Sequence, residues 1–94
     1  MKQLLEQNPS SAFARYGLAM EYVNSGALEE AVNEFKAILA GDPGYSAAYF
    51  HGGQTLEKLG RLEEAREFYR RGAAVTHDSH ARAELQAALD ILGD

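Results

Sequence analysis

The residues best suited to metal binding or acid–base chemistry are histidines, two of which flank an aspartate. His77 and His80 lie three positions apart with Asp78 between them, and imidazole and carboxylate groups are common ligands of transition metals. Two histidines in a connecting turn do not complete a metal site. Asp78 and Ser79 are also residue types that cap the N-termini of helices. The pattern favours a turn followed by a helix cap, and we expect no metal.

Nucleophilic catalysis has less support than metal binding. The chain has no cysteine, which excludes disulfides, thiolate zinc sites and thiol nucleophiles. His51-Gly52-Gly53 resembles the glycine-rich oxyanion segment of some esterases, but the G-x-S-x-G nucleophile motif is missing and the segment falls inside an expected helix. No phosphate-binding loop or converging set of carboxylates stands out. We therefore expect no catalytic residues and no cofactor, and an enzyme or small-molecule binder is the weakest hypothesis.

The charge balance bears on possible partners. Fourteen acidic and nine basic residues give a net charge of -5, so the surface should repel nucleic-acid phosphates. The arginines of the second half alternate with glutamates at helical spacing, which is typical of a solvated face of ion pairs. Apolar runs reach only four residues, which excludes a membrane span. Since the first residues also lack the apolar stretch of a secretory signal, we expect a cytoplasmic protein.

The secondary-structure elements that would carry a binding surface can be predicted from an internal repeat. The sequence repeats itself with a period of 34 residues. The positions that match after this shift include prolines, glycines and a four-residue run, namely Pro9 with Pro43, Gly26 with Gly60, and Leu-Glu-Glu-Ala at 28–31 with the same run at 62–65. A period of this length is the signature of repeat architectures.

Each repeat predicts two helices joined by a glycine turn, over residues 11–24 and 28–40 in the first unit and 46–59 and 62–76 in the second. Apolar residues recur at three- and four-residue steps along them, and Gly26 and Gly60 suit a left-handed helix stop. A fifth amphipathic segment follows, with Leu85, Leu89 and Leu92 on one face, which we expect to pack on the preceding helix. Strands are not expected.

The first unit carries Leu18-Ala19, Tyr22, Ala31, Phe35 and Pro43, and the second carries Tyr49, Gly53, Leu56, Ala65 and Tyr69. These residues and their spacings resemble the signature of the tetratricopeptide repeat, which places small and aromatic residues where paired helices pack. The first unit has Arg15 in the place of an aromatic residue, and the second has Gly52 in the place of leucine and His77 in the place of proline.

The resemblance covers residues 9–77. It implies an all-α, right-handed α-solenoid of two helix-turn-helix units, over 9–42 and 43–77, followed by a capping helix over 78–94. Leu4-Leu5 aligns with Ile38-Leu39 under the same shift. Residues 1–8 are therefore expected to be the end of a partial repeat, and the whole chain a single domain.

The resemblance also implies a non-catalytic protein–protein interaction module, or scaffold, in which the first helix of each unit lines a concave groove. The candidate groove residues are Phe13, Tyr16, Met20, Phe50, His51 and Gln54. Tyr16 and Phe50 are equivalent under the shift and are expected side by side. Some family members bind a peptide carboxylate through basic groove residues, but here only Lys58 lies near, so a peptide with an apolar or aromatic anchor is expected.

Two alternatives for these rings stay open at the level of sequence. The core could bury Phe13, Tyr16 and Met20, or two copies of the chain could bury this face against each other as a structural homo-oligomer. The glycines inside the expected helices raise a separate question, because each costs about 1 kcal/mol relative to alanine. Either neighbouring rings fill the space at Gly52 and Gly72, or the second unit is loosely packed and less stable.

Overall fold

The computed structural model describes residues 11–93, and within them every regular element is an α-helix. The five helices are α2 (Ala12–Ser25), α3 (Leu28–Gly41), α4 (Ser46–Lys58), α5 (Leu62–Val75) and α6 (Ser79–Leu92). The expected all-α architecture is confirmed, with helix ends within a residue or two of the predicted ones. The partial repeat end expected over 1–8 lies outside the described residues. None of the helices in 11–93 combines the length and apolar character needed to cross a bilayer.

The helix ends follow from capping chemistry. The hydroxyl of Ser11 accepts a hydrogen bond from the backbone N–H of Ala14 at 3.2 Å, which satisfies one free donor at the start of α2. Gly26 and Gly60 have φ of 84° and 77°, a left-handed conformation that costs little only for glycine. Both predicted glycine turns are therefore confirmed.

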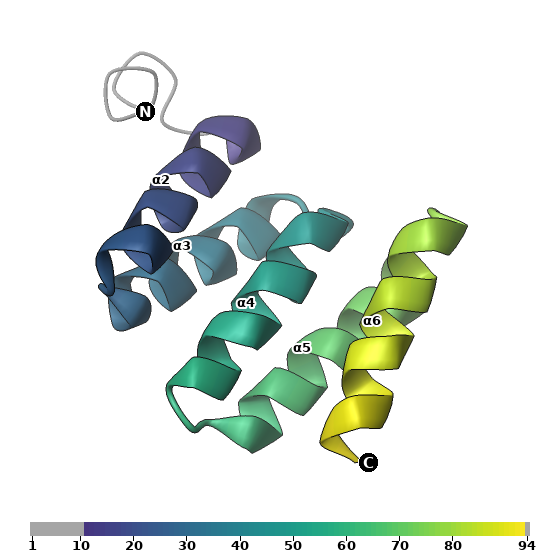
Figure 1. The fold of residues 1–94 in the computed structure, drawn as a ribbon. Helices are drawn as coiled ribbons and strands as arrows, with labels where there is room; N and C mark the ends of the chain where they lie inside the picture. The colour runs from purple at the N-terminus through teal and green to yellow at the C-terminus, as the bar shows by residue number, and fades with distance from the viewer. Residues whose placement is uncertain (1–10, 94) are drawn as a thin grey trace.

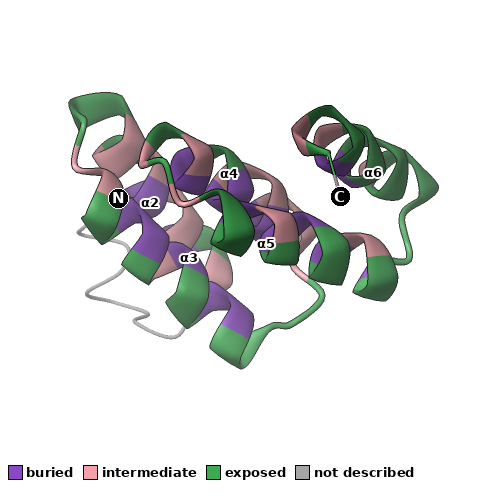
Figure 2. Cartoon of the chain, turned by 90° about the horizontal axis from the view of Figure 1, so that it is seen from below, coloured by how far each residue is buried: buried purple, intermediate pink, exposed green. Residues whose placement is uncertain are grey.

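Successive helices pack antiparallel to form two layers (Figures 1 and 2). Helices α2, α4 and α6 lie in one layer and α3 and α5 in the other. The buried side chains gather between the layers, and the alanines at the small-residue positions are fully buried: Ala19, Ala31, Ala48 and Ala65. Small residues let the helix axes approach closely, as the repeat signature implies.

The glycines of the second unit mark places where rings lie against helix backbone. A Cβ atom built at Gly52 would stand 2.5 Å from the ring of Phe68, and one built at Gly72 would stand 2.6 Å from Cβ of Tyr49. Neighbouring rings therefore occupy this space, which is the first of the two explanations offered by the sequence. The cost in helix propensity is offset by close packing.

The last helix covers the end of the second unit. Leu85 and Leu89 are 1% and 5% exposed and belong to the core that α5 helps to form, so the predicted packing of this apolar face is confirmed. Arg82 of α6 also donates hydrogen bonds to the carbonyls of Ala73 and Thr76 at the end of α5, at 3.2 and 2.5 Å. These bonds satisfy carbonyls that have no partner within α5.

Candidate functional site

A groove open to solvent runs between α4 and α6. It consists of two adjoining pockets of about 370 and 400 Å³, and both are lined by Phe50 of α4 and Glu84 of α6. Because they share these residues, we treat them as the two sections of one feature, the α4–α6 groove. The section near the start of both helices is lined about equally by polar and apolar groups, and we call it the polar section because Asp78, His80 and His51 lie in it. The section near their ends is mainly apolar.

The apolar section is built on the ring of Phe50. This ring packs on the buried ring of Tyr69, with centroids 6.4 Å apart. The core therefore holds the Phe50 ring in position at the base of the groove. Ala88 and Ile91 of α6 line the opposite wall. Ile91 is 85% exposed, although isoleucine is among the residue types most often buried in proteins. Because Ile91 lines the same pocket as Phe50 and Ala88, its exposed surface is part of a larger apolar area, and such areas mark contact surfaces.

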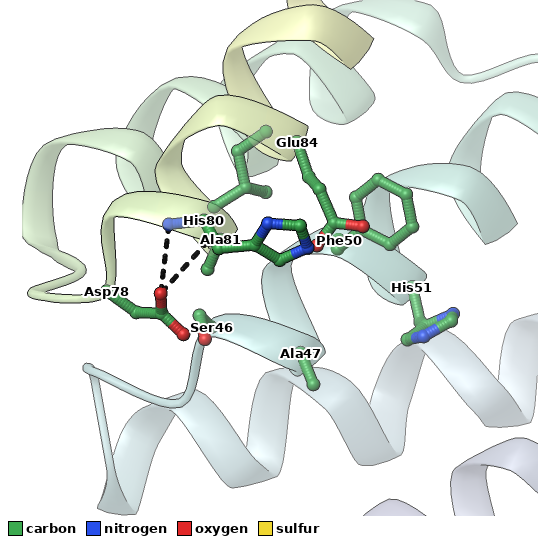
Figure 3. A pocket seen from close by; sticks show the side chains of 9 residues that line it. Ser46, Ala47, Phe50, His51, Asp78, His80, Ala81 and Glu84 are labelled. Atoms are coloured by element: carbon green, nitrogen blue, oxygen red, sulfur yellow. Dashed lines mark hydrogen bonds between the residues drawn. The ribbon is translucent and has the colours of Figure 1, made fainter.

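The polar section holds the histidine and aspartate that first suggested metal chemistry (Figure 3). The Asp78 carboxylate accepts hydrogen bonds from the backbone N–H groups of His80 and Ala81, at 2.9 and 3.4 Å, and so caps α6. His80 and Glu84 lie near the middle of this view, and His51 lies further along α4. In the part of the chain that the structure describes, no three His, Cys, Asp or Glu side chains are arranged to hold a metal ion. The predicted cap at Asp78 is confirmed.

Partial burial affects the ionisable groups of the groove. It lowers the pKa of His51, against a smaller opposing effect of the Glu84 carboxylate. Burial also raises the pKa of Tyr69, whose hydroxyl donates a hydrogen bond to the Glu57 carboxylate on the groove wall. His51 is therefore mostly neutral near pH 7, and Glu57 is held in place by Tyr69.

The structure divides the residues predicted for the groove into two sets. Phe50, His51 and Gln54 line the α4–α6 groove. Phe13, Tyr16 and Met20 lie on α2, where Tyr16 and Met20 are partly buried against the core, while Phe13 is 63% exposed.

The rings of Tyr16 and Phe50 both pack against the ring of His51. The His51 ring lies 5.9 Å from that of Tyr16 and 5.3 Å from that of Phe50, between centroids. Tyr16 also packs on Phe35 and Tyr45, at 6.3 and 5.8 Å, and this burial raises its pKa. Tyr16 therefore packs in part against the core, as one of the alternatives left open by the sequence would have it.

The α6 side of the groove was missed by the sequence analysis. In the apolar section its lining residues are Glu84, Ala87, Ala88 and Ile91, which recur at steps of three and four along the helix. This spacing places them on one face, next to the face that carries Leu85 and Leu89. This second, shorter stripe of residues at helical spacing was the sequence signal that could have revealed the α6 wall.

Known proteins match the chain over most of its length. A model of the tetratricopeptide repeat family matches residues 22–89. An uncharacterized protein of Methanocaldococcus jannaschii is 35% identical over 79 residues, which cover 83% of this chain and 92% of that protein. A TPR repeat-containing protein of Pseudomonas aeruginosa is 29% identical over 92 residues, covering 95% and 88% of the two chains.

Solved structures show the same architecture. The solution NMR structure of a tetratricopeptide repeat domain protein from Salinibacter ruber matches with a TM-score of 0.86 and 29% identity, over 92% of this chain and 90% of that chain. A crystal structure of a tetratricopeptide repeat domain protein from the same organism gives a TM-score of 0.80 at 29% identity, over 87% and 94%. With the family match over residues 22–89, these likenesses show that the chain belongs to the tetratricopeptide repeat family.

Proposed function

We propose that this protein is a non-catalytic protein-interaction module whose α4–α6 groove binds a peptide segment of a partner protein. Proteins of the tetratricopeptide repeat family are in general non-catalytic modules that bind other proteins. The observation that carries the proposal is the exposure of Ile91, at 85%, on the wall of a groove built on Phe50. An apolar side chain of a partner placed there would remove both surfaces from water.

The size of the groove limits what it can accept. Its apolar section, at about 400 Å³, lies at the lower end of the roughly 300–1,000 Å³ typical of ligand pockets. That volume suits one or two side chains of a segment lying along the groove rather than a folded domain inserted into it. The proposal therefore places a peptide anchor between α4 and α6, with flanking residues on the polar section.

Selection of random short peptides displayed on phage tests this function with the full chain as bait. We expect enriched peptides whose binding is lost in Ile91→Ser, a change that removes an exposed contact without touching the core. Val75→Ser is the matched control, since Val75 is 41% exposed on α5 and does not line the groove. If no peptide is enriched, or if all enriched peptides bind Ile91→Ser as well as wild type, the proposed function is wrong.

A second candidate, self-association, is favoured by the exposure of Phe13 on α2, at 63%. Two copies that covered this ring would form a structural homo-oligomer. Sedimentation velocity over a wide concentration range tests this, with Phe13→Ser as the variant that should remain monomeric. A wild-type protein that stays monomeric at high concentration excludes this function.

A further inference from the structure

The apolar section of the α4–α6 groove carries a carboxylate on each wall. Glu57 comes from α4 and Glu84 from α6. Oε2 of Glu57 accepts a hydrogen bond from the Tyr69 hydroxyl, which leaves Oε1 available to a bound partner. Glu84 has no hydrogen-bond or ion-pair partner within residues 11–93. Both groups stand beside Phe50 and Ile91, where a bound segment would displace water and strengthen any charge–charge contact.

This arrangement differs from most of α3 and α5, where five glutamates are paired with arginines. Arg15 pairs with Glu34 at 2.9 Å, and Arg61 bridges Glu29 on α3 and Glu64 on α5, both at 2.8 Å. Within the described part of the chain, no lysine or arginine lines either section of the groove. The two carboxylates of the groove thus lack the cations that most glutamates of α3 and α5 have.

We propose that the segment bound in the α4–α6 groove is basic, with an apolar side chain on Phe50 and Ile91 and a lysine or arginine beside it on Glu84 and Glu57. This inference rests on the proposed function and adds the charge of the partner. A guanidinium or ammonium group there would form charge-assisted hydrogen bonds with both carboxylates. The net charge of -5 would also favour the approach of a cationic segment.

The same charges select against other partners. An acidic peptide, or a C-terminal carboxylate placed in the apolar section, would bring a like charge next to Glu57 and Glu84 and lose affinity. A neutral apolar segment would bury the same surface and leave both carboxylates partly desolvated without a partner. Discrimination among peptides should therefore follow charge, while anchoring depends on the apolar contact.

The composition of peptides selected on the full chain tests the inference. At about pH 8, where a histidine of ordinary pKa is neutral, we expect the enriched peptides to carry lysine or arginine within a few positions of an apolar residue. Synthetic versions of the most enriched peptide, with each basic residue replaced by uncharged citrulline or by glutamate, should bind more weakly in that order. If the Ile91-dependent peptides are neutral or acidic, the charge inference fails while the proposed function stands.

Two protein variants test whether the preference for basic peptides comes from the groove carboxylate Glu84. Glu84→Gln should weaken binding of the enriched peptide about five-fold, the upper end for a partly exposed ion pair, and the difference should vanish at about 1 M salt, where the Debye length is about 3 Å. Glu30→Gln is the matched control, because Glu30 is an exposed glutamate on α3 that lines no pocket described here. Equal affinities for the two variants would overturn the inference. The absence of any Ile91-dependent peptide would overturn the proposed function and this inference with it.

Discussion

Replacing Gly72 with alanine tests how closely α5 packs against its neighbours. A Cβ atom at this position would stand 2.6 Å from Cβ and 2.8 Å from Cγ of Tyr49, and 3.0 Å from Cδ1 of Leu85. Leu85 can relieve its contact by turning its side chain. Cβ of Tyr49 is fixed to the backbone of α4, so that contact is relieved only if the two helices move apart.

The expected size of the effect is a balance of two terms. Overpacking a core costs about 1–3 kcal/mol, and alanine gains about 1 kcal/mol over glycine within a helix. Tyr49 and Leu85 are each 1% exposed, so the clash is enclosed on both sides and should lie at the upper end. The net loss is then about 2 kcal/mol, which lowers the Tm of a domain of this size by about 8–16 °C.

Circular dichroism melts and urea titrations measure this loss directly. Gly41→Ala is the control, because Gly41 ends α3 with nothing within 4 Å of a built Cβ, and it should be neutral or stabilising by up to about 1 kcal/mol. A Gly72→Ala protein as stable as wild type would refute the close approach of α4 and α5.

Three further changes probe the cap, the groove and the last helix. Asp78→Ala removes the hydrogen bonds that cap α6 and should cost about 1 kcal/mol in urea titrations. Burial lowers the pKa of His51 in the folded protein, so the unfolded chain binds the proton more readily, and stability present above about pH 6.5 should fall as the pH drops below it. His51→Gln should lessen that fall, and an unchanged pH profile would contradict the assignment. Removing residues 78–94 takes Leu85 and Leu89 out of the core and uncovers the face of α5 on which α6 packs, so the shortened chain should aggregate in sedimentation runs. A monomeric, equally stable product would argue against a capping role.

The fold could be predicted from the sequence because the repeat carries local and packing signals together. Gly26 and Gly60 recur at the same place in each unit, and both adopt the left-handed conformation that the turn requires. Ala31 and Ala65 recur likewise, and both are fully buried. Signals that agree at several levels specify one structure.

The groove could be predicted only in part, because its walls come from segments far apart in the chain. The α4 wall, with Phe50 and His51, followed from the position of α4 in the repeat. The α6 wall did not, since the capping role of α6 was inferred from the Leu85 face alone, and Ile91 lies on another face. The space at Gly72 likewise depends on where Tyr49 lies across the helix pair, which no local pattern reveals.

The most direct test of the proposed groove compares two exposed apolar residues that differ in position. Ile91 lines the α4–α6 groove, and Phe13 lies on α2 outside it. Calorimetric titration with the most enriched peptide should show at least about a ten-fold loss of affinity for Ile91→Ser, since burying such a side chain contributes about 1.5–3 kcal/mol, and wild-type affinity for Phe13→Ser. Loss of binding in Phe13→Ser with full binding in Ile91→Ser would contradict the proposal and place the binding surface on α2.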